Sequence, residues 1–404
     1  MNSRAKSDWF QKWLAPTIAP ANRRAGRIRR SRRWGATQAW KALSLRFSWL
    51  LLFLAQSVAA ASTNLSPVSV WDVSARVTAG LGYRDNVLRS SLATENSGFF
   101  LSTADATFIR LAESGTYVAL YLLGEDTRYF DAPSVDYEQF FSGTVQFTTP
   151  AGERDELGIE ASYLYQHQIL DVSETAASLR RVLVDGHSIT LHPHWQHALG
   201  PDWAILLEGT GFRQIYESEL DDYWDGSGRL SLIRTYGNRS EVAVGYQALL
   251  RFFDTREQFD EFGIIVPGTS LYYWQHEIGG RWRHHWDEAR NWRTASKLSY
   301  MFNRDNGSGY FDYDRLLFSE QLRWSAGDWE IKANARFGWY FYKVQQIGGD
   351  DRERAYVVLD FRVERRLGKH WLIYAGAERE WDTSNDPLDE YDDWMAGGGI
   401  GVEF

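Results

Sequence analysis

The chain of 404 residues contains no cysteine, so it forms no disulfides and holds no thiolate-bound metal. This absence is compatible with an oxidising compartment but does not require one. Beyond residue 60 the chain also lacks any run near the roughly 18 apolar residues that a membrane-spanning helix needs. Only 44% of the residues are hydrophobic. Together these shortages exclude a helical membrane protein.

Basic residues are scarce in the same part of the chain. Of the 44 Lys and Arg, 32 follow residue 60, whereas 52 of the 53 Asp and Glu do so, which gives this part a net charge of −20. Such an acidic balance opposes nucleic-acid binding. Residues 1–60 are the reverse, with 12 basic residues and a single acid, Asp8.

The N-terminal region has the order of a secretory signal. A short apolar run from Trp49 to Ala55 follows the basic residues, and small residues from Val58 to Ser62 follow the run. A membrane-anchor helix is the alternative, but the apolar core is too short for one. We therefore expect a basic region and signal peptide over 1–60, with cleavage after Ala60 or Ala61, and one barrel domain over 61–404.

From residue 67 onward, segments of roughly 11–17 residues alternate between apolar and polar positions, as β-strands with two different faces do. The clearest segment runs from Trp329 to Tyr342. Its odd positions are apolar or aromatic, and its even positions include Glu330, Lys332 and Arg336. Aromatic residues make up 15% of the chain, an excess typical of the aromatic girdles of membrane barrels.

Short and long connections take turns between these segments. Short turns are expected near 113–115, 150–152, 199–201, 237–238, 287–290, 326–328 and 368–369, and long loops near 85–97, 130–136, 168–183, 216–224, 254–270, 303–312, 344–352 and 383–390. This pattern predicts an all-β fold, a transmembrane antiparallel up-and-down β-barrel of about 16 strands with both termini at the short-turn end. Fourteen or eighteen strands fit if the less regular segments 117–129, 226–234 and 315–324 are divided differently. A secreted two-sheet sandwich is the alternative, but its strands would be shorter.

The chain closes on alternating apolar residues, Ile400, Val402 and Phe404. This ending resembles the C-terminal assembly signal of bacterial outer-membrane barrels. The resemblance implies that the barrel-assembly machinery is a partner and that the protein lies in the outer membrane of a Gram-negative-type bacterium. Outer-membrane lipid and lipopolysaccharide would then surround it.

A barrel of about 16 strands is too wide for side chains to fill, so its inward faces must line water or a plug. We expect the polar positions on the strands between residues 277 and 366 to form one side of this lumen. Nine basic residues there constitute what we call the basic wall: Arg281, Arg283, Arg293, Lys297, Arg323, Lys332, Arg336, Arg362 and Arg366. Glu330, Asp360 and Glu364 lie among them. Two interpretations stay open: the charges pair and hydrate the lumen, or they favour passing anions.

Other candidate sites are weaker. His192 and His194 share a polar face, but no third ligand is evident, so we expect no metal and no cofactor. His167 and Ser173 lie near one loop, where a rim-located hydrolase would carry its site, yet no G-x-S-x-G motif occurs after the signal, so we expect no enzyme. The loops are acidic and could share divalent cations with lipopolysaccharide phosphates. The apolar tip Gly263–Pro267 could fold into the lumen or bind a partner.

The segment from Gly80 to Val87 (GLGYRDNV), followed by a long barrel ending in Phe404, resembles the opening of a β-barrel porin family linked with exopolysaccharide export. It is also similar to the barrel half of surface-lipoprotein assembly proteins, although this chain lacks the helical repeats of that family. The resemblance implies a porin-like channel or export pore for small solutes, anionic sugars or polysaccharide. A non-conducting surface barrel, whose acidic loops bind a partner or stabilise the envelope, is the alternative.

Overall fold

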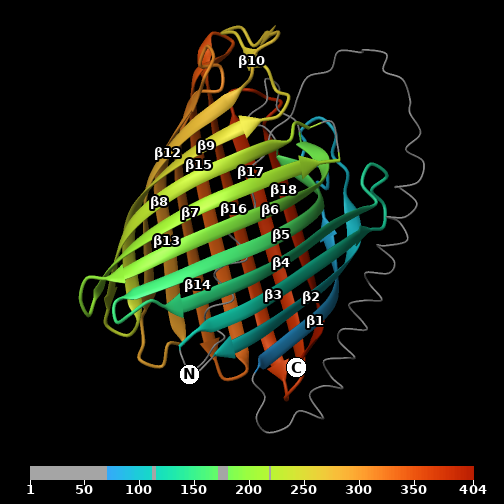
Figure 1. Cartoon of the computed structure of the whole chain (residues 1–404). Helices are drawn as coiled ribbons and strands as arrows, with labels where there is room; N and C mark the ends of the chain where they lie inside the picture. Colours follow the sequence, from blue (N-terminus) through green and yellow to red (C-terminus); the bar gives the residue numbers. More distant parts are fainter. Residues whose placement is uncertain (1–70, 112–114, 172–180, 218–219) are drawn as a thin grey trace, which may run out of the picture.

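A computed structural model describes residues 71–111, 115–171, 181–217 and 220–404, and the expected signal region lies outside these residues. The described chain contains strands and connections but no helix (Figure 1). The strands are β1 (Asp72–Arg84), β2 (Ser97–Leu111), β3 (Tyr117–Tyr129), β4 (Tyr137–Pro150), β5 (Asp155–Asp171), β6 (Arg181–Ala198), β7 (Trp203–Tyr216), β8 (Tyr223–Tyr236), β9 (Ser240–Phe253), β10 (Gln258–Phe259), β11 (Ile265–Val266), β12 (Tyr272–His285), β13 (Trp292–Asp305), β14 (Tyr313–Ala326), β15 (Trp329–Ile347), β16 (Asp350–Leu367), β17 (Trp371–Ser384) and β18 (Tyr391–Glu403).

Sixteen of these strands form one closed antiparallel barrel, and β10 and β11 form a separate small hairpin between β9 and β12. Each barrel strand pairs with its neighbours in sequence, and β1 pairs with β18 to close the ring, with Arg76 opposite Glu403. Backbone hydrogen bonds between Ala75 and Phe404, at 2.9 and 3.2 Å, extend this closure. The predicted fold class and strand number are confirmed.

The short turns, the start of β1 and the end of β18 lie at one end of the barrel, and most of the longer loops lie at the other end (Figure 1). The prediction of a long loop at 344–352 is wrong, because the structure has a short turn there. β15 runs to Ile347 and β16 starts at Asp350, so only Gly348 and Gly349 connect them. Both glycines have positive φ, 63° and 99°, which suits a tight hairpin turn. A register shift between Phe341 and Gln346 breaks the alternation there, and this break looked like the end of a strand in the sequence.

The outer surface of the barrel is apolar. Large side chains such as Leu230, Val244, Ile278 and Leu298 are exposed on outward positions near the middle of their strands. Aromatic residues flank this zone at both ends. Exposed Trp203, Trp292, Trp329 and Trp371 lie beside the short turns, and Trp224, Trp274, Trp339 and Phe341 lie toward the loops. In the described part of the chain, no helix has the length and apolar character needed to span a bilayer.

The loop end contains an apolar core that the sequence did not reveal. Buried side chains from β6 to β12 meet two loops there: Val184, Tyr216, Tyr223, Phe253, Phe259, Leu271, Tyr273 and Phe311. This set, which we call the mouth core, packs the ends of the strands together. The tip of the 254–271 loop points away from it, since Phe262 is 78% and Ile264 63% exposed, and β10 projects beyond the rim (Figure 1). Of the two expectations for this tip, insertion into the lumen is therefore wrong.

Candidate functional site

The strand register decides which side chains face the lumen, because residues directly opposite each other in an antiparallel sheet point to the same side. Arg76 on β1 contacts Glu364 on β16 at 3.0 Å, although β17 and β18 lie between these strands. Such a contact can form only across the concave face. Following the pairing from these two residues places all twelve predicted lumen residues on the same, inner face.

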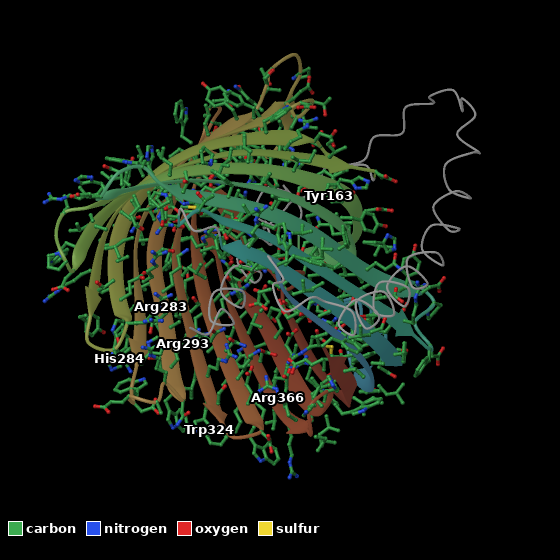
Figure 2. All side chains as sticks on the ribbon, turned by 60° about the horizontal axis from the view of Figure 1, so that its bottom comes forward. Tyr163, Arg283, His284, Arg293, Trp324 and Arg366 are labelled. Atoms are coloured by element: carbon green, nitrogen blue, oxygen red, sulfur yellow. The ribbon has the colours of Figure 1, made fainter. Side chains whose placement is uncertain are left out.

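Figure 2 views the barrel toward its short-turn end and labels three inward-facing and three outward-facing residues. Arg283, Arg293 and Arg366 occupy inward positions in the register, whereas His284, Trp324 and Tyr163 occupy outward positions. His284 directly follows Arg283 along β12, so neighbouring residues serve opposite faces.

Four cations lie side by side across β13 to β16. Arg293 is directly opposite Arg323, Arg323 is opposite Lys332, and Lys332 is opposite Arg362. Like charges directly opposite one another repel in a sheet. This row therefore requires carboxylates close by, and the sequence supplies them two positions away along the strands.

Glu330 and Glu364 provide these carboxylates. Glu330 lies 2.7 Å from Arg323 and 2.8 Å from Lys332. Glu364 accepts a hydrogen bond from Arg362 at 2.7 Å and also binds Arg76. Both carboxylates are buried, so each is held between two cations instead of being open to the lumen. Charge-assisted hydrogen bonds of this kind are among the stronger polar contacts in proteins.

Other members of the basic wall also have partners. Arg281 and Arg283 share Glu241, at 3.1 and 2.8 Å. Lys297 lies 3.4 Å from Glu277, and Arg366 lies 3.1 Å from Glu403. Arg293 donates a hydrogen bond to the side-chain oxygen of Gln321 at 3.1 Å, and Asp360 accepts one from Asn334. Most of the predicted wall is thus tied into pairs.

Arg336 differs from the rest of the basic wall. Its side chain is exposed, and it makes no hydrogen bond, ion pair or ring contact with the described residues. The residues directly opposite it, Ser319 on β14 and Val358 on β16, carry no charge. Its chain neighbours Ala335 and Phe337 face outward between Trp329 and Trp339, so Arg336 lies near the middle of the barrel wall.

The inward face of β16 and β17 also holds charges that the sequence analysis missed. Arg354 forms a buried pair with Asp382, and Arg352 lies 3.1 Å from Asp389. The predicted long loop 344–352 contains Arg352, and the predicted basic wall on this strand extends only over Arg362 and Arg366. Continuing the even-numbered alternation of β16 back to Arg352 would have found both arginines.

The histidines of the weaker candidates have other contacts in the structure. His192 lies 3.4 Å from Glu208, and among the described residues no group of three or more His, Cys, Asp or Glu is arranged to hold a metal ion. His167 faces outward, stacked on Tyr137 and 3.3 Å from Asp185. Ser173 lies outside the described residues.

The terminal residues Ile400, Val402 and Phe404 share the outward face of β18, as the register with β17 requires. Trp371 lies opposite Val402 on the same face. In hydrocarbon every backbone polar group must be paired internally, which a closed barrel achieves, and an apolar band between aromatic belts matches a bilayer. The fold and its two faces define an outer-membrane β-barrel.

No protein-family model matches the chain, and no curated protein matches it. Solved structures with a similar fold include OccAB1 from Acinetobacter baumannii, with 10% identity, a TM-score of 0.45 and coverage of 83% of this chain and 97% of that one. OprD from Pseudomonas aeruginosa has 9% identity and a TM-score of 0.43, covering 82% and 95%. An anion-selective porin from Comamonas acidovorans has 10% identity and a TM-score of 0.42, covering 83% and 99%. A likeness this distant assigns neither a family nor a solute to the chain.

Proposed function

We propose that this protein is a porin-like channel for small polar solutes across the outer membrane, with a preference for anions. The observation that carries the proposal is the inner face of the barrel. It is charged along its length, which requires water, and one arginine near its middle, Arg336, has no partner among the described residues. A packed interior would pair or exclude such a group.

The distribution of charge supports the anion preference. The inward face from β12 to β16 carries the basic wall, whereas the inward face of β17 and β18 carries the acids Glu378, Glu380, Asp382, Asp393 and Glu403. Opposite charges on different parts of one lumen create a field across it, and such a field orients and concentrates charged solutes. Anionic sugars and polysaccharide are the solutes we propose, following the sequence resemblance.

A non-conducting surface barrel is the second candidate, and the mouth core favours it. Eight buried side chains pack the strand ends of β6 to β12 against two loops on that side of the loop end. In this candidate the exposed acidic loops would contact lipopolysaccharide through shared divalent cations, and the barrel would stabilise the envelope.

Single-channel recording of the purified, refolded protein in planar bilayers separates the two candidates. A channel should give discrete openings whose reversal potential in a salt gradient lies on the anion side. Folded protein that inserts, but leaves the bilayer silent, would favour the surface barrel. Truncating the loop 254–271 offers a further check, because opening of a previously silent barrel would identify the mouth core as the closure.

A further inference from the structure

We infer that Arg336 is the residue at which a passing anion is bound, and that the other cations of the basic wall mainly hold the barrel together. The inference rests on the proposed channel and deepens it, since it names one contact and its chemistry. A carboxylate or phosphate oxyanion is the group that a free guanidinium recognises.

The first step is availability. A cation already bound to a carboxylate must give up that partner before it binds a solute, whereas a free cation need not. Arg281, Arg283 and Arg362 all lie within 3.1 Å of a carboxylate. Within the part of the chain that the structure describes, Arg336 has no such partner, and it is exposed. Arg336 therefore differs from these three arginines in being available to bind a solute.

The second step is position. Residues opposite one another across the sheet define a level in the barrel, and the level of Arg336 contains Lys297, Ser319, Val358 and Glu380 in successive strands. At this level the nearest carboxylate, Glu380 on β17, is two strands away, roughly 10 Å. Asp360 on β16 is a diagonal neighbour, but its contact is with Asn334. Ser319 and Val358, which lie directly opposite Arg336, carry no charge that would compete with an oxyanion for the guanidinium.

The third step is the path. From the short-turn end, a solute first meets the paired row of Arg293, Arg323, Lys332 and Arg362. Arg336 lies four residues farther along β15 than Lys332, on the same face. A free cation beyond a row whose members already have hydrogen-bond partners gives one weak binding position at mid-depth. Conduction requires binding that is favourable yet weak enough for release.

The test compares the wild type with Arg336→Gln, Arg336→Lys and a matched control, Arg229→Gln. Arg229 also faces inward in mid-strand, but it lies on β8, pairs with Glu208 at 3.7 Å and donates to Ser231. Each Gln variant removes one positive charge from the lumen, so an effect of net charge alone would be equal in the two. Circular dichroism and the gel mobility of the unboiled protein establish that each variant is folded.

Two readouts are applied to the same proteins. Binding of inorganic phosphate to the detergent-solubilised barrel is followed by ³¹P line broadening, and glucuronate and neutral glucose are compared as blockers of the channel current in dilute KCl. We expect Arg336→Gln to weaken phosphate binding and glucuronate block about tenfold, the size expected for loss of a charge-assisted hydrogen bond. Arg229→Gln should change both less than twofold, and glucose should block none of the proteins.

Arg336→Lys distinguishes charge from shape. Retained phosphate binding with weakened glucuronate block would indicate that the planar guanidinium recognises the carboxylate. If all channels are silent but only Arg336→Gln loses phosphate binding, the anion site stands and the channel proposal fails. Equal losses in Arg336→Gln and Arg229→Gln, or no loss in either, would overturn the inference.

Discussion

The two faces of β14 and β15 are built from one alternating sequence, yet they treat charge in opposite ways. On the inner face Arg323 and Lys332 are both ion-paired with Glu330. Between the aromatic belts of the outer face almost every position is apolar, and the exception there, Glu320, has no hydrogen bond or ion pair with the described residues. Water in the lumen therefore permits charged side chains, but ion pairing determines which of them remain free to bind a solute.

Adding a charge to the outer face should have the largest effect. We expect Phe404→Asp to abolish or strongly reduce assembly, because Phe404 completes the outward apolar series of β18 and closes on Ala75. A charge on the lipid-facing side also costs up to a few kcal/mol, depending on depth. Heat-modifiable gel mobility of outer-membrane fractions measures the folded protein. Phe404→Trp, which keeps an aromatic ring, is the control, and wild-type levels of Phe404→Asp would contradict the assembly role.

Unbalancing the inner face comes next. Glu364→Gln removes the carboxylate that both Arg76 and Arg362 contact, so two partly buried guanidinium groups lose a partner. We expect the free energy of unfolding to fall by about 1–3 kcal/mol, measured by denaturant titration of tryptophan fluorescence. The reversal potential should also move further toward anions.

A double variant controls this prediction. Glu364→Gln combined with Arg362→Gln removes the pair together, so part of the lost stability should return. If the single variant is as stable as the wild type, Glu364 does not hold the wall together.

Removing the charge from the outer face should have a smaller effect of opposite sign. Glu320 lies opposite Ser296 and Ala335, and Ala335 is placed between the aromatic belts of Trp329 and Trp339. A lipid-facing carboxylate costs less than the roughly 2–4 kcal/mol of a midplane Lys or Arg. Glu320→Leu should therefore raise the free energy of unfolding in lipid by up to about 2 kcal/mol. A decrease would indicate that Glu320 binds a partner within the membrane, such as a second copy of the chain.

The facing of these side chains could be predicted from the sequence, but their pairing could not. Alternation alone assigned Arg283, Arg336 and Glu364 to the inner face, because a strand has period two and a membrane barrel has only two environments. Pairing was not predictable in this way. Arg76 and Glu364 are 288 residues apart and meet only because β1 closes on β18. The availability of Arg336 likewise depends on which side chains surround it after closure.

The smallest and most local effect that we predict comes from a buried carboxylate in a loop outside the membrane. The side chain of Asp389, in the loop before β18, is buried, and this burial raises its pKa to about 6, although Arg352 opposes the shift. The pKa in the folded loop thus exceeds the ordinary value of 3.8, so the folded loop binds the proton more tightly than the opened one. Its stabilisation by protonation is present at low pH and is lost as the pH rises through about 6.

Hydrogen exchange measures this effect, because a loop can open without unfolding the barrel. The amide of Asp389 donates to the carbonyl of Asp386 at 3.0 Å, and its protection, corrected for intrinsic exchange, should be greater at pH 5 than at pH 7.5. Asp389→Asn cannot titrate and should lose this pH dependence. Protection that instead increases with pH would mean that the ion pair with Arg352 outweighs burial, and that paired charges in the loops behave like those of the inner face.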